Sequence, residues 1–369
     1  MIADTTFESC EVAVLGGGPA GAACAIALAR AGVGRVVLCE SEEARPFRLG
    51  ETIPPDSRAL LDRLGVLDAF LADEHMACHG SCSSWGSDGL GYNDFMLRPY
   101  GHGWHIDRPR FEELLLESAA QAGAELWLGA QFAGTERIDG GHRLAFRGAP
   151  ALQARFVVDA TGCSAAFARR QEAQRTGLDT LHCIAARFRK AAPGLSRLTW
   201  LEAVPEGWWY ASRLPSDRLL VLFASDADVV RDHGFSDPET WLAALRRTRH
   251  IRALLGHVSD AHERPRAGAA PSFCLDRVAG DDWAALGDAA SSCDPVTARG
   301  LWKALSGALV LADAIPAALA GDTAPLDAYA AAVRQDFTTY RAMRRDLYGL
   351  ETRWPDAPFW ARRHASVTA

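Results

Sequence analysis

Glu11-Val-Ala-Val-Leu15 runs directly into Gly16-Gly-Gly-Pro-Ala-Gly21, and a stretch rich in Ala, Leu and Ile follows from Ala22 to Arg30. The first run is apolar and β-branched, which predicts a short buried strand, and the third predicts a helix. A second strand is predicted at Arg35-Val-Val-Leu-Cys39, and it ends at Glu40. This order of strand, glycine turn, helix, strand and terminal acid predicts a dinucleotide-binding βαβ unit.

The glycines and the acid of this unit each have a physical role. Gly16 permits the tight turn out of the strand, and Gly18 lets a pyrophosphate approach the backbone. Gly21 lets the helix pack closely on the sheet, and the helix N-terminus offers free N–H groups and a partial positive charge to the phosphates. The Glu40 carboxylate accepts hydrogen bonds from ribose hydroxyls and disfavours a further phosphate there.

FAD and NAD share this glycine turn, so later segments must distinguish them. One predicted strand ends in Asp159-Ala-Thr-Gly162, and another leads into Gly287-Asp288-Ala-Ala290 and then Pro295. Gly300 opens an Ala- and Leu-rich helix that is predicted to end just short of Pro316. This ordered set resembles the large family of flavin monooxygenases and flavin halogenases.

The resemblance implies that FAD is the cofactor. In that family the late aspartate, here Asp288, contacts the ribityl chain, and the next helix points its N-terminus at the flavin, where it stabilises negative charge. An arginine just before the predicted helix 112–122 touches the cofactor in these relatives, so Arg108 or Arg110 is a candidate, with an ordinary exposed arginine as the alternative. The candidate cofactor-binding residues are therefore Gly16, Gly18, Gly21, Glu40, Arg108, Asp159, Gly162, Gly287, Asp288, Pro295 and Gly300.

The expected fold class is α/β: an FAD-binding, Rossmann-like domain of the glutathione-reductase type, with an inserted, mainly antiparallel β substrate domain and C-terminal helices. The inserted region has strand character at 84–85, 92–97, 103–106, 199–202, 207–214 and 218–224. The predicted boundaries are 1–75, 107–178 and 270–325 for the discontinuous FAD-binding domain, 76–106 and 179–269 for the substrate domain, and 326–369 for the helical segment.

Aromatic residues and histidines concentrate in the inserted region. Trp85, Trp104, Trp208 and Trp209 together suit a pocket for a planar aromatic substrate, although packing in the core is the alternative for each of them. His102 and His105 lie in the same region, where either is a candidate general base or a structural histidine.

A closer resemblance is to halogenase-like maturation enzymes of the LodB and GoxB type, to which oxidation of a tryptophan in a partner protein is attributed. The matching segments are Leu49-Gly-Glu-Thr-Ile-Pro-Pro55, Tyr100-Gly-His-Gly-Trp-His-Ile-Asp-Arg108, Gly207-Trp-Trp-Tyr210 and 287–305. This resemblance spans most of the chain. It implies an indole- or tryptophan-like substrate, as an aromatic small molecule or within a peptide or protein.

Halogenation requires a lysine that captures hypohalous acid, normally after the Gly-Glu-x-x-Pro segment. No lysine occurs before Lys190, and Thr297 and Arg299 replace the usual residues of the halide loop. The sequence therefore favours a monooxygenase that hydroxylates through a flavin C4a-hydroperoxide. His102 or His105 is the expected base, and Arg299 the group that stabilises charge on the flavin or substrate.

No second dinucleotide turn is visible, so electrons are expected from NAD(P)H bound transiently at the flavin or from a separate flavin reductase. Two alternatives remain open: another flavin oxidoreductase, such as a halogenase or a prenyl reductase, and a non-catalytic flavin-fold binding protein. Oxygen from O2 in the product would favour the monooxygenase. Reduction of the bound flavin followed by its rapid reoxidation in air would exclude a non-catalytic binding protein.

The bulk composition limits the partners. Lys and Arg total 39 against 46 Asp and Glu, so neither nucleic acid nor an anionic membrane is an expected partner. Nine cysteines without a CxxC pair suggest buried thiols of a cytoplasmic protein, and no metal site is expected. The uncharged run 12–29 is interrupted by glycines, which favours a strand and a helix over a membrane span.

Overall fold

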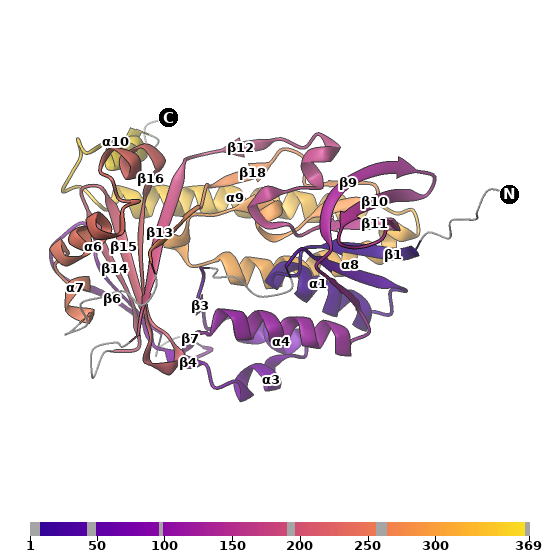
Figure 1. The fold of residues 1–369 in the computed structure, drawn as a ribbon, viewed down its shortest axis with the longest axis horizontal. Helices are drawn as coiled ribbons and strands as arrows, with labels where there is room; N and C mark the ends of the chain where they lie inside the picture. The colour runs from indigo at the N-terminus through magenta and orange to yellow at the C-terminus, as the bar shows by residue number, and fades with distance from the viewer. Residues whose placement is uncertain (1–7, 43–48, 96–98, 190–195, 256–263, 366–369) are drawn as a thin grey trace.

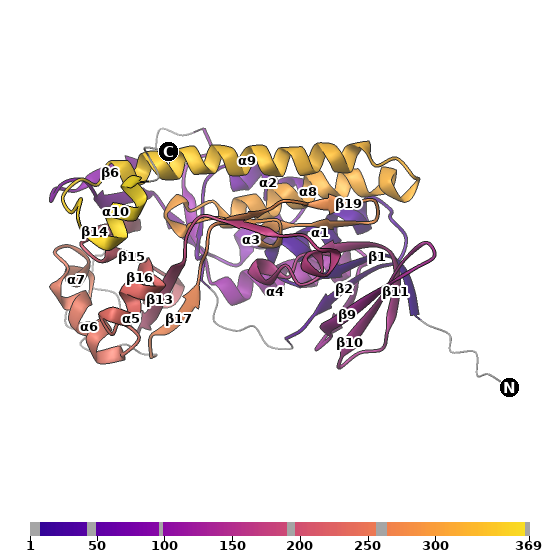
Figure 2. The same ribbon diagram turned by 90° about the horizontal axis from the view of Figure 1, so that it is seen from above.

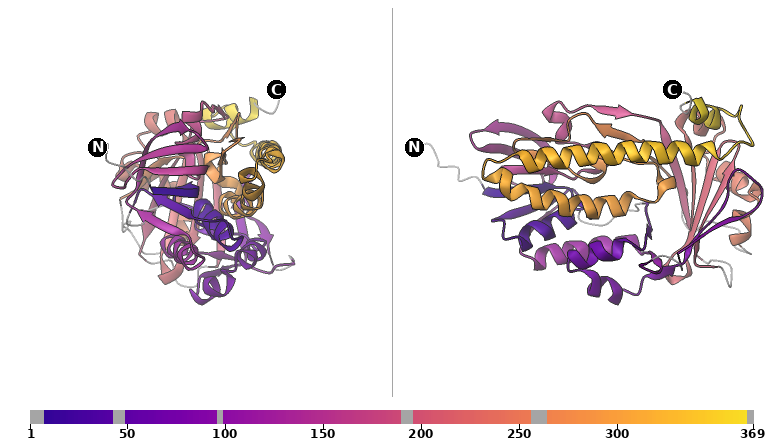
Figure 3. Two further views of the ribbon diagram at one scale, coloured as in Figure 1. Left: turned by 90° about the vertical axis from the view of Figure 1, so that its right-hand side faces the viewer. Right: turned by 180° about the vertical axis from the view of Figure 1, so that it is seen from behind.

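The computed structural model describes residues 8–42, 49–95, 99–189, 196–255 and 264–365. The molecule is elongated, with one sheet region around β1 (Glu8–Leu15) and a second around β13 (Leu181–Phe188) at the opposite end. The long helix α9 (Ala324–Gly349) runs beside α8 (Gly300–Leu319) and connects the two regions (Figures 1 and 3).

The first region contains the predicted dinucleotide unit in an eight-stranded sheet. Its main path is β19-β20-β11-β1-β2-β8, and the hairpin β9–β10 attaches to β11. The central pairs β2–β1 and β1–β11 are parallel, with Val14 opposite Leu38 and Val158, and all three side chains are buried. The bounds are β1 Glu8–Leu15, β2 Val36–Glu40, β8 Glu125–Leu128, β9 Gln131–Ile138, β10 Gly141–Arg147, β11 Leu152–Asp159, β19 Ala279–Gly280 and β20 Trp283–Ala285. The predicted α/β class is confirmed.

Helices cover this sheet and carry its glycine turn and late helix start. They are α1 (Pro19–Arg30), α2 (Ser57–Arg63), α3 (Leu67–Ala72), α4 (Arg108–Gln121), α8 and α9. The predicted end of α8 before Pro316 is wrong, because the helix continues to Leu319. Pro316 lies near the last turn, where it removes only its own N–H donor, and its carbonyl still accepts from the Ala320 N–H at 3.2 Å.

The second region is a seven-stranded sheet of order β17-β13-β16-β15-β14-β5-β6, antiparallel except for the parallel pair β14–β5. The bounds are β5 Gly80–Ser84, β6 Gly91–Asp94, β13 Leu181–Phe188, β14 Leu198–Val204, β15 Gly207–Arg213, β16 Leu219–Asp226 and β17 Arg266–Ala269. Residues 96 and 97 of a predicted strand lie outside the described residues. The inserted, mainly antiparallel sheet is confirmed.

This sheet has two differently covered faces. One packs against α5 (Ala227–Asp232), α6 (Pro238–Arg247) and α7 (Ile251–Leu254), and the other meets α10 (Pro358–Ala365) and the first region. Figure 2 shows α5, α6 and α7 gathered at the outer side of the sheet, and α10 beside the end of α9. The inner face is therefore the one that can complete a site with the dinucleotide unit.

Short elements connect the two regions. One three-stranded sheet joins β3 (Thr52–Ile53), β7 (Gly103–His105) and β4 (Met76–Cys78), and another joins β12 (Arg175–Gly177), β18 (Phe273–Leu275) and β21 (Ser291–Ser292). Single 3-10 turns follow at η1 (Gly162–Ser164), η2 (Ala168–Gln171), η3 (Pro215–Asp217), η4 (Gly287–Ala289) and η5 (Pro295–Thr297).

Candidate functional site

The glycine turn has the tight backbone that a pyrophosphate requires. Gly16 has a φ of +107°, and a Cβ there would lie 2.3 Å from the Ala160 carbonyl oxygen. A Cβ on Gly21 would lie only 1.9 Å from the Gly16 carbonyl oxygen, so neither position accepts a side chain. Gly18 is the N-cap of α1, so the first N–H groups of that helix face the adjoining cavity.

Glu40 braces this turn and also faces the cavity. Its buried carboxylate accepts the Gly17 N–H at 2.7 Å and the Glu42 N–H at 3.1 Å. Ser41 Oγ also donates to this carboxylate at 3.1 Å. The structure therefore adds a bracing role to the predicted contact with ribose.

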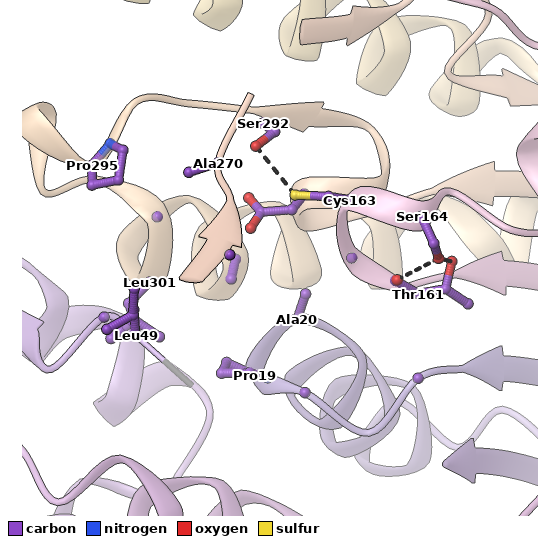
Figure 4. Close-up of a pocket in the computed structure, with 18 of the residues that line it drawn as sticks. Pro19, Ala20, Leu49, Thr161, Cys163, Ser164, Ala270, Ser292, Pro295 and Leu301 are labelled. Carbon is purple, nitrogen blue, oxygen red and sulfur yellow. Dashed lines mark hydrogen bonds between the residues drawn. The ribbon is translucent and has the colours of Figure 1, made fainter. Parts of the chain in front are cut away.

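A cavity of about 880 Å³ extends from the glycine turn to the inner face of the second sheet (Figure 4). Its nucleotide end includes Gly16, Gly18, Glu40, Arg108, Gly162, Asp288, Pro295 and Gly300. Its sheet end includes Cys183, Trp208, Tyr210, Leu220 and Leu222. Figure 4 shows residues from the N-terminal ends of α1 and α8, such as Pro19 and Leu301, around the same space. Eight of the eleven predicted cofactor-binding residues thus converge on the cavity walls, with Gly21 packed behind the turn.

Arg108 reaches the cavity whereas Arg110 does not. The Arg108 side chain donates to Glu112 Oε1 at 2.7 Å and to the Gly50 carbonyl at 2.9 Å, and it lines the cavity. Arg110 instead pairs with Asp73 at 3.0 Å and with Glu117 at 3.2 Å, both outside the cavity. The geometry therefore separates the two arginines that the sequence left as alternatives.

Asp159 and Gly287 shape the site without lining it. The buried Asp159 carboxylate accepts from Thr161 Oγ1 at 2.6 Å and from the Ala168 N–H at 2.8 Å, which closes the loop after β11. A Cβ on Gly287 would lie 2.7 Å from the Ala20 Cβ, so this glycine permits contact between the late turn and α1. Both residues support neighbours that do face the cavity.

Asp288 lines the cavity and is held by a lysine. Lys303 Nζ donates to Asp288 Oδ1 at 3.0 Å and also to the Ser291 carbonyl oxygen. The Asp288 side chain keeps 48% of its exposure. One of its oxygens therefore remains available for a ribityl hydroxyl, in the position that the resemblance implies.

The structure does not bring His102 or His105 to the cavity. His105 is fully buried beside Thr199 Oγ1 at 3.0 Å, and burial lowers its pKa to about 4. The exposed His102 donates from Nδ1 to the Gly103 carbonyl at 2.8 Å. Neither ring lines the cavity, so the structure does not bring the two histidines predicted as catalytic bases together with the other candidate site residues.

Among the four tryptophans expected to bind substrate, Trp208 alone lines the cavity. Adjacent residues of a strand point to opposite faces, so Trp209 packs against Trp241, with 5.2 Å between ring centroids. Trp104 packs on Phe70 in the first core, and Trp85 donates to the carbonyl at 347. These three are core residues, which was the alternative reading of each.

Arg299 lies at the cavity mouth, immediately before α8. Its guanidinium is 4.7 Å from the centroid of the Trp302 ring, and its side chain is exposed. This position supports the predicted contact of Arg299 with an anionic group in the cavity.

Glu51 is a candidate that the sequence reasoning missed. Its side chain is 2% exposed and lines the cavity, and its Oε2 accepts the Gly50 N–H at 2.9 Å. Its Oε1 accepts no hydrogen bond from any described residue and lies 3.7 Å from Arg187 Nη2. Burial raises the pKa of this carboxyl, and the positive charges of Arg187 and Arg108 oppose that rise.

Thr52 and Tyr210 lie beside this carboxylate. Thr52 Oγ1 and the Tyr210 hydroxyl are 2.7 Å apart, and both residues line the cavity. The segment 49–55 was visible as a motif, but only the pairing of β3 with β7 shows which of its side chains turn inward. Hydrogen-bonding groups thus occupy the sheet end of an otherwise apolar wall.

Two other features of the described residues bear on the site. They contain no group of three or more His, Cys, Asp and Glu side chains arranged to hold a metal ion. Helix α8 is long and apolar enough to span a membrane, and half of its apolar window is buried within the protein, as in a core helix.

Comparison with known proteins identifies a family. The sequence profile described as "FAD binding domain" matches residues 9–340. The putative FAD-dependent oxidoreductase LodB of Marinomonas mediterranea is 27% identical over 97% of this chain and 98% of its own length. The flavin-dependent halogenase armH4 of Armillaria mellea is 26% identical over 84% of this chain and 65% of its own length.

Solved structures show the same fold. The myxobacterial chondrochloren halogenase CndH has a TM-score of 0.87 at 22% identity, covering 96% of this chain and 86% of its own. The peptidyl tryptophan dihydroxylase QhpG has a TM-score of 0.78 at 25% identity, covering 96% of this chain and 78% of its own. The relatives and the cavity together assign FAD as the cofactor and an oxidoreductase as the class of enzyme.

Proposed function

This chain belongs to the FAD-binding-domain family, and from that premise we propose that it is a monooxygenase that hydroxylates an indole- or tryptophan-like ring. When bound, reduced FAD would supply the two electrons that activate O2, with one oxygen atom entering the substrate and the other leaving as water. The protein supplies orientation, a cavity that excludes water, and a group that accepts the ring proton.

The observation that carries this proposal is the composition of the cavity wall opposite the glycine turn. Trp208, Leu220 and Leu222 present apolar surface there, and Tyr210 presents a hydroxyl paired with Thr52. Such a wall suits a flat ring that carries one polar N–H or O–H group. A ring bound on it would lie between the sheet and the dinucleotide end of the cavity.

We assign the proton acceptor to Glu51 in place of the histidines. Glu51 lines the cavity, and its buried Oε1 has no hydrogen-bond donor among the described residues, which leaves this oxygen as an acceptor for a proton. Arg187 and Arg108 stabilise the carboxylate form against the cost of burial. During hydroxylation a ring C–O bond forms, a ring C–H bond breaks, and the proton passes to this oxygen.

Halogenation is the alternative that the names of several relatives favour. Halogenation requires a lysine that captures hypohalous acid, and the chain offers only two lysines for this role, Lys190 and Lys303. Lys303 is held by Asp288 and the Ser291 carbonyl, and Lys190 lies outside the described residues. The pattern of charged groups in the cavity therefore supports oxygen transfer over halogen transfer.

The printed names of two relatives suggest the form of the substrate. QhpG is described as acting on peptidyl tryptophan, and a chlorinase from Pseudomonas fluorescens acts on a pyrrole carried by a protein. We propose that this chain likewise acts on a ring attached to a peptide or protein, and that NAD(P)H or a separate flavin reductase supplies electrons. A cytoplasmic location and the absence of nucleic-acid and membrane partners stay predictions.

The test is turnover of the FAD-loaded protein with reduced flavin, labelled O2, chloride and bromide, and a tryptophan-containing peptide. We expect the peptide to gain oxygen that carries the label. A product with the isotope pattern of chlorine or bromine would overturn the proposal in favour of halogenation. Reoxidation of the flavin that leaves every tested indole and peptide unchanged would also overturn it.

A further inference from the structure

Strand β17 forms one edge of the second sheet and borders the cavity. It pairs with β13, and no other described strand pairs with it. All four of its residues, Arg266 to Ala269, are exposed, and all four line the cavity. Figure 2 shows β17 at the margin of the sheet, and Figure 4 places Ala270, the next residue, among those lining the cavity. An open sheet edge therefore leads directly into the candidate active site.

The register shows which backbone groups face outward from this edge. The Ala270 N–H donates to the Leu181 carbonyl at 2.8 Å, so these opposite residues form a hydrogen-bonded pair. Hydrogen-bonded and non-bonded pairs alternate along an antiparallel ladder. The pair of Gly268 with Cys183 is therefore bonded, whereas the N–H and C=O groups of Ala267 and Ala269 point away from β13.

The side chains of β17 leave this edge accessible. Natural sheets usually protect edges with prolines, charged side chains or bulges. Here Pro265 and Arg266 stand at the start of β17, and the rest of the strand, 267–269, reads Ala-Gly-Ala. Gly268 is opposite Cys183, which lines the cavity, and a Cβ on Gly268 would meet no atom within 4 Å. The strand therefore leaves open space on its cavity side at Gly268.

We propose that β17 is a docking strand for an extended polypeptide substrate. The peptide adds a strand to the sheet by bonding to Ala267 and Ala269, and it directs an aromatic side chain past Gly268 into the cavity. The identity of the ring rests on the proposed function, whereas the docking of the peptide backbone rests on the sheet edge alone. Main-chain bonds of this kind bind many sequences, and the cavity then selects the side chain.

Proline substitutions test the edge without removing bonds to β13. Ala267→Pro and Ala269→Pro each remove one outward donor, and the matched control is Tyr92→Pro at the opposite edge. In β6 the Phe95 N–H donates to the His79 carbonyl at 2.9 Å, so the same alternation turns Tyr92 outward as well. Strand β6 does not line the cavity, so its variant should leave binding unchanged.

The probes are an extended peptide with one central tryptophan, the same peptide N-methylated on alternate residues, and free indole. Binding to the oxidised, FAD-loaded protein is followed through the flavin absorbance. One backbone hydrogen bond contributes about 1 kcal/mol, so each proline is expected to raise the peptide Kd about fivefold and the double variant about thirtyfold. The Kd of free indole is the internal reference and should change much less than that of the peptide, and FAD content and Tm should not change.

The outcomes distinguish this inference from the proposed function. Wild-type affinity of the peptide for the double proline variant, or equal binding of both N-methylated registers, would overturn docking at β17. If the peptide binds in the predicted manner but is halogenated or left unchanged, docking stands and the monooxygenase proposal fails. If indole is hydroxylated while the wild-type protein ignores the peptide, docking fails and the monooxygenase proposal stands.

Discussion

The two ends of the cavity were predictable to very different degrees. At the nucleotide end the function depends on backbone shape, and Gly16 and Gly21 are needed because a Cβ would collide with carbonyl oxygens. At the sheet end it depends on which side chains face inward, and adjacent residues such as Trp208 and Trp209 have opposite roles. A backbone requirement can be recognised in the sequence as a glycine at a fixed position. The direction of a side chain, in contrast, is decided by pairing between distant strands.

The largest effect is expected from Gly21→Val, which should weaken FAD binding at the nucleotide end of the cavity. The new Cβ would lie 1.9 Å from the Gly16 carbonyl oxygen, so the turn must open or α1 must move. FAD affinity should fall at least about a hundredfold, or about 3 kcal/mol, as measured by the flavin content of purified protein. Gly177→Ala, where a Cβ meets no atom within 4 Å, is the control. A fully yellow Gly21→Val protein would show that the turn does not hold the cofactor.

The next largest effect is expected at the sheet end, from Glu51→Gln. Loss of a positioned base lowers turnover by about a hundredfold or more, with FAD content unchanged. Glu113→Gln, a change on the exposed face of α4, is the control. Retained turnover in Glu51→Gln would remove this residue from the mechanism.

The pH profile tests the same residue independently. Burial raises the pKa of Glu51, and the base must be ionised to accept a proton. The kcat/KM of the wild-type protein should therefore fall as the pH is lowered through a value above the usual range for glutamate. In Glu51→Gln this acidic limb should disappear, and persistence of an identical limb would assign it to another group.

A pair of conservative substitutions sharpens the contrast within one strand. Trp208→Phe removes cavity surface and the hydrogen bond of the indole to the Tyr348 hydroxyl at 3.0 Å, so KM for the aromatic substrate should rise about fivefold. Trp209→Phe should leave KM unchanged and lower the unfolding free energy by about 1–2 kcal/mol, because this ring packs with Phe223 and Trp241. Equal changes in KM would mean that the faces of β15 are not separated as described.

The sequence predicted the fold class and most of the nucleotide wall because each depends on local patterns. A glycine turn after an apolar strand, and a glycine before an Ala-rich helix, need no information about distant residues. Glu51 could not be assigned this way, because its role depends on Arg187 from β13 and on Tyr210 from β15. The edge position of β17 likewise follows from strand order, which the sequence does not state.

His105 has the side chain of a base but not the position of one, and its substitution is expected to have the smallest effect on turnover. It was a reasonable base from sequence, but it is buried beside Thr199 and does not line the cavity. Burial lowers its pKa to about 4, below the ordinary value of 6.5, so unfolding favours its protonation. Its contribution to stability is therefore present above pH 6.5 and is lost as the pH falls toward 4.

His105→Gln should accordingly make the Tm less sensitive to pH within that window. Turnover at neutral pH should change by less than about twofold, because His105 does not line the cavity proposed to hold the substrate ring and the cofactor. His102→Gln, at an exposed position two residues earlier, controls for a general loss of histidine. A large fall in turnover for His105→Gln, with Tm and FAD content preserved, would mean that β7 supplies chemistry as well as packing. The site would then depend on β7 as well as on the backbone of the glycine turn and the side chains of the second sheet.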